Sequence, residues 1–292
     1  MGNWGEPFIG SEALAAGTVN WHQLRTRYCA LFPDVYMERL AQPSLQQRIS
    51  AAWLWSRRRA TIAGLAAASL HGSKWIDTDI AVELVHANAR PPSGIVTRRD
   101  RLLDDEVVIL DGRSVTSVER TAFDIGRRGS VFAAVARLDA LANATGFKID
   151  DVAAIARRHR RLRGLRHLEK VLELVDAGAQ SPKESQVRLW LIEAGFPPPQ
   201  TQIPVFGPDG VPFAFIDMGW QEWMLGVEYE GKHHYDNRLQ IASDIYRLEK
   251  VERRYRIVRV TAEDRRANVV RRVHNAVEAQ GFECPCTLSS VR

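Results

Sequence analysis

The spacing of apolar positions divides the chain into stretches typical of helices and shorter stretches typical of strands. Apolar residues recur every three or four positions in the former and run almost without interruption in the latter. We expect helices over 11–16, 20–27, 45–55, 61–70, 118–125, 131–142 and 150–161, and strands over 80–85, 95–98 and 106–110. This mixture predicts an α+β N-terminal region with helices around a small mixed sheet.

The first forty residues predict two short helices followed by a strand. Asn20 opens the second helix, and Gln23 stands at the capping-box position. The turn over 32–36 leads into a short strand, so the order is that of a winged helix, a DNA-binding module. On that interpretation the second helix presents Asn20, His22, Gln23, Arg25 and Arg27 to DNA. A plain helical pair that caps the domain explains the same pattern, and the sequence leaves both open.

A second domain is predicted to begin at Ser181. A Leu/Val-rich helix over 164–180 ends in small and polar residues, and Ser181 can then cap a new helix. Pro182 fits the first helical position, Glu184 fits the capping box, and Gly195 ends the helix. We therefore expect three parts: a winged-helix-like module over 1–45, an α+β domain over 46–176 and an α/β domain over 181–292.

The last domain is predicted to contain four strands. Strands are expected over 202–206, 212–218, 223–230 and 255–261, with helices over 238–253 and 267–280. A strand, a helix and a further strand form a crossover connection, so the strand over 255–261 should run parallel to the strand over 223–230.

Three carboxylates fall on two neighbouring strands of this domain. Glu228 and Glu230 lie two residues apart and share a face, and the short turn can bring Asp217 within reach of Glu228. Converging carboxylates repel one another unless a cation offsets the charge, and oxygen ligands suit Mg²⁺ or Mn²⁺. A solvent-facing strand with hydrated acids is the alternative. We favour a metal site because the strands are apolar enough to be central, where isolated acids are costly.

Composition and charge restrict the class of protein. The chain has 292 residues, 45% of them hydrophobic and 26% charged, as in ordinary globular proteins. It has no apolar run of the roughly 18 residues that a membrane helix needs, and residues 1–16 do not resemble a signal peptide. We expect a cytoplasmic protein without a membrane partner.

The charge is weakly positive, with 40 Lys and Arg against 35 Asp and Glu. Arginines are concentrated over 157–166 and 253–272, which a nucleic-acid partner or a merely solvated surface would explain equally well. Three cysteines are too few for a disulfide framework. Cys284 and Cys286 form a C-x-C pair, which is a weak zinc signal without further cysteines.

The C-terminal domain resembles the DUF559 group of Vsr-like nuclease domains in the PD-(D/E)xK superfamily. The matching stretches are Ser181–Glu184, Ile216–Trp220, Val227–His234, Asp244–Arg247 and Ile257–Val260. The resemblance implies a restriction-endonuclease-like fold and metal-dependent DNA cleavage. It also implies that Asp217 and Glu228 bind the metal, with Glu230 in the second acidic position. Glu184 would assist the metal or the attacking water, unless it serves only as a helix cap.

Two further residues follow from the same resemblance. His234 would contact the scissile phosphate or transfer a proton. Glu230 stands where the superfamily motif has lysine, and Lys232 lies two residues later, on the same side if the strand continues that far. The missing lysine supports an alternative, a protein whose nuclease-like domain only binds DNA or a partner.

Residues 8–145 resemble AbiEi-like antitoxins and regulators. The matching stretches are Ser11–Gly17, Asp34–Tyr36, Ala66–Gly72 and Val115–Thr121. This resemblance implies a winged-helix DNA-binding module followed by an α+β domain.

The leading hypothesis is a DNA-binding endonuclease, and the alternative is a non-catalytic transcriptional regulator or antitoxin. RNA as substrate ranks lower because no stacking-aromatic motif is evident. A toxin, a second subunit or a second copy of the chain stays open as a partner.

Overall fold

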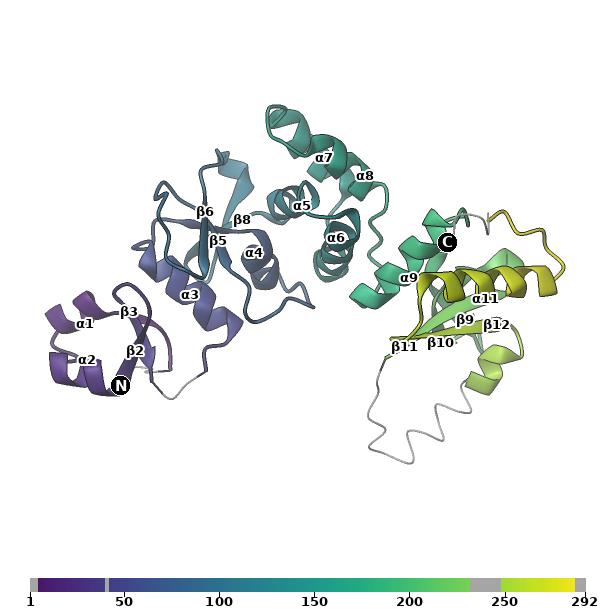
Figure 1. The fold of residues 1–292 in the computed structure, drawn as a ribbon, viewed down its shortest axis with the longest axis horizontal. Coiled ribbons are helices and arrows are strands. Elements are labelled where there is room, and N and C mark those ends of the chain that lie inside the picture. Colours follow the sequence, from purple (N-terminus) through teal and green to yellow (C-terminus); the bar gives the residue numbers. More distant parts are fainter. Residues whose placement is uncertain (1–4, 40–41, 232–247, 287–292) are drawn as a thin grey trace. The chain divides into compact units, whose positions relative to one another are not determined.

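A computed structural model describes residues 5–39, 42–231 and 248–286. The chain forms two compact units. The first consists of Met1–Gly129 and Ala144–Glu173, and the second of Ser130–Asn143 and Leu174–Arg292. The second unit is therefore discontinuous in sequence. Figure 1 shows the ribbon of each unit, with helices and strands in both, which confirms the α+β class.

The N-terminal part of the first unit combines two short helices with a three-stranded sheet. Its elements are β1 (Phe8–Ile9), α1 (Gly10–Ala15), α2 (Trp21–Arg27), β2 (Tyr28–Phe32) and β3 (Val35–Glu38), and the strand order is β1-β3-β2. The predicted capping box is present, with Asn20 accepting from the Gln23 amide and Gln23 accepting from the Asn20 amide. The sequence did not predict β2. Tyr28 follows Leu24 by four positions, so it fits the buried face of a longer α2 as well as the start of a strand.

A five-stranded sheet forms the centre of the first unit. Its strands are β4 (Thr61–Ala63), β5 (Val82–Val85), β6 (Ile95–Arg98), β7 (Val107–Leu110) and β8 (Arg113–Thr116), in the order β6-β5-β4-β8-β7. The helices of this part are α3 (Leu45–Trp55), α4 (Gly64–Leu70), η1 (Asp104–Glu106), α5 (Val118–Gly126), α7 (Ile149–Arg158) and α8 (Leu165–Leu172). The predicted helix over 61–70 was wrong at its start, because Thr61–Ala63 form the central strand and Gly64 turns the chain with φ 58°.

Among the described residues, Arg120 is the largest side chain that is fully buried. Its guanidinium group donates to the carboxylates of Glu106 at 2.5 Å and Asp124 at 2.8 Å, and both carboxylates are also buried. This arrangement links α5 to η1. Because every charge in it has an opposite charge beside it, burial is tolerated.

The second unit is built on a four-stranded sheet. Its strands are β9 (Gln200–Phe206), β10 (Pro212–Trp220), β11 (Leu225–Glu230) and β12 (Arg256–Thr261), in the order β12-β11-β10-β9. Its helices are α6 (Val131–Thr145), α9 (Pro182–Glu193), η2 (Gln221–Trp223) and α11 (Arg266–Ala279), with a further helical turn over 248–252. The β9, β10 and β11 strands are antiparallel, and β12 runs parallel to β11, which confirms the predicted orientation.

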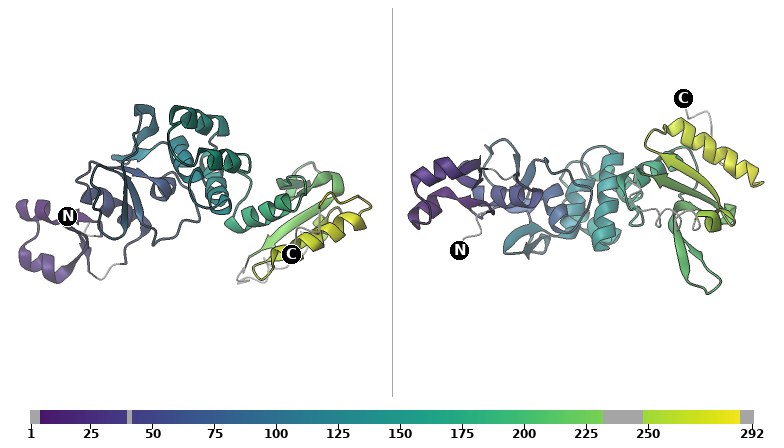
Figure 2. Two further views of the ribbon diagram at one scale, coloured as in Figure 1. Left: turned by 45° about the horizontal axis from the view of Figure 1, so that its top comes forward. Right: turned by 90° about the horizontal axis from the view of Figure 1, so that it is seen from below.

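Helices cover one face of this sheet, and a smaller cluster covers the other. In Figure 1, α9 and α11 lie together over the sheet, where Val187 and Val273 pack against Val227 and Val260. Ile203, Ile216 and Val251 form the core on the opposite face. The β9–β10 hairpin extends away from these helices in the right-hand view of Figure 2, and Phe206 and Phe215 are exposed on it.

The α6 helix is fastened to α9 by a buried polar cluster. Asp139 accepts hydrogen bonds from the Ser185 hydroxyl at 2.7 Å, the Arg188 guanidinium at 2.8 Å and the Asp176 amide at 2.8 Å. Burial raises the pKa of Asp139 and outweighs the opposing effects of Arg188 and the three hydrogen bonds. The cluster fixes the first turns of α9, which carry Glu184.

Candidate functional site

In β10, the alternation of side chains between the two faces of the sheet is interrupted at Asp217. Ile216 belongs to the core with Val251, whereas Met218 belongs to the core beneath α9 and α11 on the other face. Two residues separated by one position share a face on a regular strand, so the pleat is broken at Asp217. Directly across on β9, Gln202 has a positive φ of 51°. Such conformations are uncommon outside glycine and concentrate at functional sites.

The interruption coincides with the end of the β10–β11 ladder. The last pair is Met218 with Val227, and the Asp217 carboxylate then accepts the Tyr229 amide at 2.8 Å. A side chain thus replaces the backbone carbonyl that a continued ladder would supply. Extending the register by one residue places Asp217 opposite Glu228, and both side chains are half-buried. This geometry brings the two predicted metal ligands onto adjacent strands at one point of the sheet.

Glu184 approaches Asp217 from the first turn of α9. Ser181 caps that helix as predicted, and Glu184 accepts from the Ser181 hydroxyl and the Gln180 amide, both at 2.8 Å. Burial raises the pKa of Glu184, the Gln180 amide partly offsets this, and the negative charge of Asp217 raises the pKa further. Glu184 is therefore both a helix cap and an electrostatic neighbour of Asp217.

Glu230 faces a cation supplied by the neighbouring strand. It is exposed at the end of β11, and its carboxylate lies 2.9 Å from Nε of Arg259 on β12. Arg259 also pairs with Glu252. In the part of the chain that the structure describes, no three acids of this sheet bring carboxylate oxygens within 4.8 Å of one another. Lys232 and His234 lie outside the described residues.

A divalent cation fits Asp217 and Glu228 by the chemistry of the donors. Both supply the hard oxygen atoms that Mg²⁺ and Mn²⁺ prefer. Glu184 interacts electrostatically with Asp217, but among the described residues these three carboxylates do not all converge within 4.8 Å. Part of the rise in the pKa of Glu184 comes from repulsion by Asp217, which a cation would relieve.

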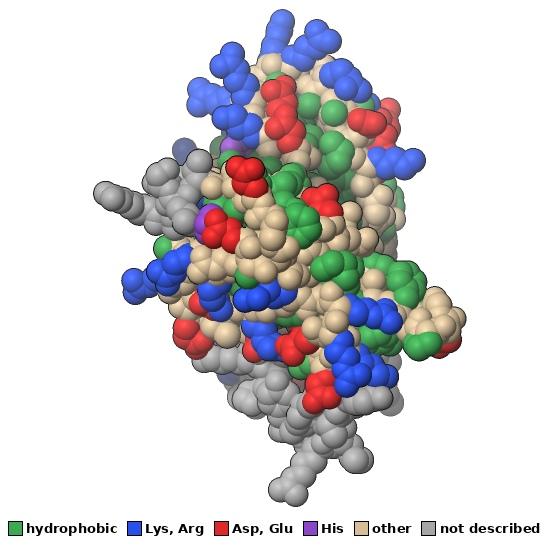
Figure 3. Space-filling view, turned by 90° about the vertical axis from the view of Figure 1, so that its right-hand side faces the viewer, with side chains coloured by type: hydrophobic (Ala, Val, Ile, Leu, Met, Phe, Trp, Pro, Cys, Tyr) green, Lys and Arg blue, Asp and Glu red, His purple; other side chains and the backbone are tan. Residues whose placement is uncertain are grey.

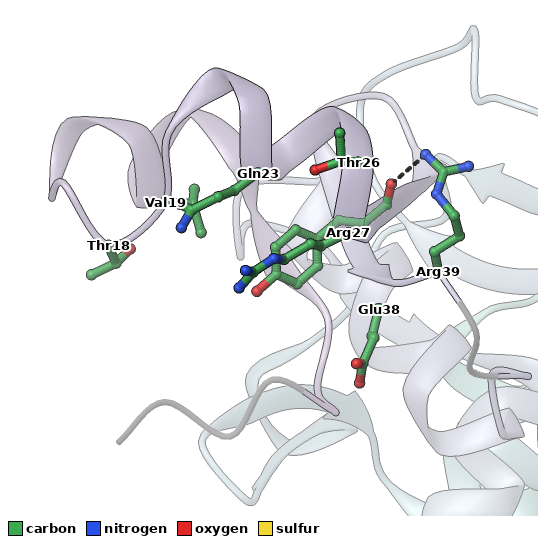
Figure 4. Close-up of a pocket in the computed structure, with 8 residues that line it drawn as sticks. Thr18, Val19, Gln23, Thr26, Arg27, Glu38 and Arg39 are labelled. Atoms are coloured by element: carbon green, nitrogen blue, oxygen red, sulfur yellow. Dashed lines mark hydrogen bonds between the residues drawn. The ribbon is translucent and has the colours of Figure 1, made fainter.

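The predicted DNA-contacting residues of α2 differ in what their side chains already contact. Asn20 and Gln23 satisfy each other in the capping box, whereas His22, Arg25 and Arg27 are exposed. Gln23 and Arg27 also line a surface pocket of about 510 Å³, shown in Figure 4. Arg39, which directly follows β3, donates to the Tyr28 carbonyl, the bond dashed in Figure 4, and also to the Arg25 carbonyl near the end of α2.

Basic and acidic side chains share the molecular surface. Figure 3 shows many Lys and Arg side chains standing out from the face it presents, with Asp and Glu among them. Several arginines of the two Arg-rich segments are paired, including Arg158 with Asp105 and Arg272 with Asp264. The positive charge is therefore partly neutralised locally.

A second group of metal-ligating residue types lies on α11 and in the segment that follows it. The ligand atoms of His274, Cys284 and Cys286 all fall within 4.8 Å of one another. Burial raises the pKa of the Cys286 thiol to about 12, and the adjacent Cys284 sulfur adds to the shift. The sequence indicated only the C-x-C pair. His274 was missed because it precedes Cys284 by ten residues in the interior of a helix.

Comparisons with known proteins give distant relatives. Uncharacterized protein Rv2248 and uncharacterized protein MT2308, from two strains of Mycobacterium tuberculosis, are each 25% identical to this chain over 213 residues. The matched region covers 72% of this chain and 77% of each relative. No family model matches the chain, and no solved structure matches it. Among the described residues, no helix is long and apolar enough to span a bilayer.

Proposed function

We propose that the protein binds DNA and that its second unit hydrolyses phosphodiester bonds as a metal-dependent endonuclease. The proposal rests on one observation: Asp217 interrupts β10 opposite Glu228, with the buried Glu184 carboxylate beside it. Asp217 and Glu228 would bind Mg²⁺ or Mn²⁺. The bound ion would lower the pKa of an attacking water and stabilise charge on the phosphate. Glu184 would orient that water or accept its proton.

The proposal includes a restriction-endonuclease-like fold for the second unit and a winged helix at the N-terminus. Three antiparallel strands followed by a parallel fourth, with α9 and α11 on one face, support the first. The order β1, α1, α2, β2, β3 supports the second. We place the protein in the cytoplasm, and the three cysteines, all free, are compatible with a reducing compartment.

Within the proposed winged helix, the exposed basic residues of α2 are the expected DNA contacts. His22, Arg25 and Arg27 are exposed, whereas the side chains of Asn20 and Gln23 are used by the helix cap. Arginines would bind phosphates and provide salt-dependent affinity. Asn20 and Gln23 then act mainly by fixing where α2 begins.

The second candidate is a non-catalytic regulator or antitoxin, whose nuclease-like unit binds DNA, a toxin or a second copy of the chain. The pairing of Arg259 with Glu230 favours it. Because a guanidinium group already offsets charge at the end of β11, this strand has less need of a metal ion. This candidate predicts DNA affinity that is unchanged by EDTA and no cleavage.

Plasmid cleavage distinguishes the two candidates. Supercoiled plasmid is incubated with the full chain in Mg²⁺, Mn²⁺ or EDTA, alongside the variants Asp217→Asn and Glu228→Gln. Each substitution removes a charge and keeps the side-chain size, and the amide oxygen of the new asparagine can still accept the Tyr229 amide. We expect cleavage to need metal and to fall roughly a hundredfold or more in each variant, the scale of losing one electrostatic group in an active site.

Glu222→Gln is the matched control, because Glu222 is an exposed carboxylate on η2 of the same unit. It should cleave like the original chain. Cleavage that persists in Asp217→Asn would refute the assignment of the metal ligands. No cleavage by a chain that binds the plasmid equally with and without EDTA would select the regulator.

A further inference from the structure

The chain folds back on itself directly after α11. Gly281 has φ 81°, its amide donates to the Glu278 carbonyl at 2.9 Å, and the Phe282 amide donates to the Val277 carbonyl at 3.3 Å. These two bonds form a Schellman motif, which ends a helix and reverses the chain. The segment over 282–286 therefore returns along α11 towards His274.

This return places two thiols beside the His274 imidazole. Nδ1 of His274 lies 3.2 Å from Sγ of Cys286, and Sγ of Cys284 lies 2.9 Å from Sγ of Cys286. Cys286 is buried in the core beneath α9 and α11, and Cys284 packs against that core. Three ligand atoms thus converge from a helix and from the segment that follows it.

The other nitrogen of the imidazole faces a carboxylate. Nε2 of His274 lies 3.3 Å from Oε1 of Glu278, one helical turn later on α11. Histidines that bind metals usually donate their second N–H to a carboxylate, a backbone carbonyl or water, which fixes the ring and the tautomer. Glu278 therefore directs a proton to Nε2 and leaves the lone pair of Nδ1 facing the two sulfurs.

We infer that His274, Cys284 and Cys286 bind a zinc ion. Thiolate and imidazole are the ligands that zinc prefers, and three of them leave the fourth tetrahedral position to a solvent molecule. Zn–S bonds of about 2.3 Å place two bound sulfurs roughly 3.8 Å apart, so binding requires the thiols to separate by about 0.9 Å from their present 2.9 Å. Rotation of the Cys284 side chain, which is only partly buried, can provide this movement.

Binding of the ion joins the returning segment to α11. Both thiols lose their protons on binding, and the ion replaces contacts between neutral groups by bonds to two thiolates and an imidazole. We expect the zinc form to protect the segment over 281–286 from proteolysis and hydrogen exchange. This inference does not depend on the proposed nuclease, because none of its ligands lies on β10 or β11.

The test uses the full chain, reduced, stripped with EDTA and titrated with Zn²⁺ or Co²⁺. We expect one ion per chain and, with Co²⁺, the intense visible absorption of a tetrahedral thiolate site. Cys284→Ser and Cys286→Ser should each weaken zinc binding more than a hundredfold. Glu278→Gln, which alters only the group behind His274, should weaken it about 10- to 100-fold, the usual effect of removing such a partner.

Two control variants test whether zinc binds elsewhere in the chain. Cys29→Ser removes the third cysteine, which lies on β2 of the first unit, and Asp217→Asn alters the proposed magnesium site; both should bind zinc normally. Unchanged hydrogen exchange in β9–β12 of each variant establishes that the unit is folded. The inference is overturned if the reduced chain retains no zinc, or if zinc binding survives in the Cys284→Ser/Cys286→Ser double variant. A Cys284–Cys286 disulfide that persists under reducing conditions would also overturn it.

Discussion

Removal of the Asp139 carboxylate should loosen α9 and displace Glu184 from its position beside Asp217. The carboxylate is 1% exposed, and the Arg188 side chain that it neutralises is 4% exposed. Asp139→Ala leaves a buried guanidinium group, a buried hydroxyl and the Asp176 amide without this acceptor. Breaking one half of a buried ion pair costs about 3–5 kcal/mol, so we expect a loss of that size in the stability of the second unit.

Native-state hydrogen exchange measures this loss where it occurs. At one decade for every 1.4 kcal/mol, the slowest amides of α6 and α9 should exchange about 100- to 4,000-fold faster in Asp139→Ala. The sheet of the first unit should keep its exchange rates. The exposed pair between Arg58 and Glu12 provides the control, because Arg58→Gln should cost at most about 1 kcal/mol and affect only the first unit.

A double-mutant cycle tests the physical reason. The variant Asp139→Ala/Arg188→Met removes both charges, so it should be more stable than the sum of the single variants by about 1–3 kcal/mol. If the two substitutions are additive, or if Asp139→Ala changes exchange in α9 by less than tenfold, the ion pair does not position α9. Plasmid cleavage by Asp139→Ala should fall while plasmid binding stays constant, because Ser185 directly follows Glu184.

Four further predictions concern pH, backbone clearance and DNA binding. Burial raises the pKa of Asp139, so the second unit should lose stability as pH rises through the interval above the ordinary carboxyl pKa, and Asp139→Asn should abolish that contribution in urea titrations. Burial acts to raise the pKa of Asp34, but hydrogen bonds from Ser11 and Arg57 outweigh this effect and lower the pKa. The first unit should therefore lose stability in urea titrations as the pH falls through the interval below the ordinary carboxyl pKa. Gly219→Ala should cost about 1–3 kcal/mol in thermal unfolding, because its Cβ would lie 2.2 Å from the Leu225 carbonyl oxygen, whereas Gly231→Ala, with 3.9 Å of clearance, should be tolerated. If α2 binds DNA, Arg25→Ala should reduce the slope of log affinity against log salt by about 0.9 for each lost phosphate contact, and the exposed Lys74→Ala should leave it unchanged.

Local signals in the sequence were sufficient to predict where a helix begins when its first turn is capped by residues close to it in the chain. Ser181, Pro182 and Glu184 predicted the start of α9, and the structure confirms the Ser181 cap. Asn20 and Gln23 likewise predicted the start of α2. In both cases the hydrogen bonds join residues three positions apart, so the signal lies within one turn of helix.

Features that depend on distant partners were missed. Thr61–Ala63 resemble the alanine-rich helix that follows them, but pairing with β5 and β8 makes them a strand. Nothing in the local pattern indicates that Asp139 pairs with Arg188, since 49 residues separate them. The pattern placed Asp217 on a strand near Glu228 but could not predict the broken pleat, which depends on cores formed on opposite faces of the sheet.

The discontinuous second unit has a consequence for the order in which the chain is made. Asp139 is synthesised 49 residues before Arg188, which at about 5–20 residues per second is a delay of roughly 2–10 s. During that time the Asp139 carboxylate has no partner on α9, because Ser185 and Arg188 have not yet been made. The segment Ala144–Glu173, which belongs to the first unit, is also made before α9. A chain that ends at residue 180 therefore contains α6 without Ser185 and Arg188, and its α6 amides should exchange faster than those of the full chain.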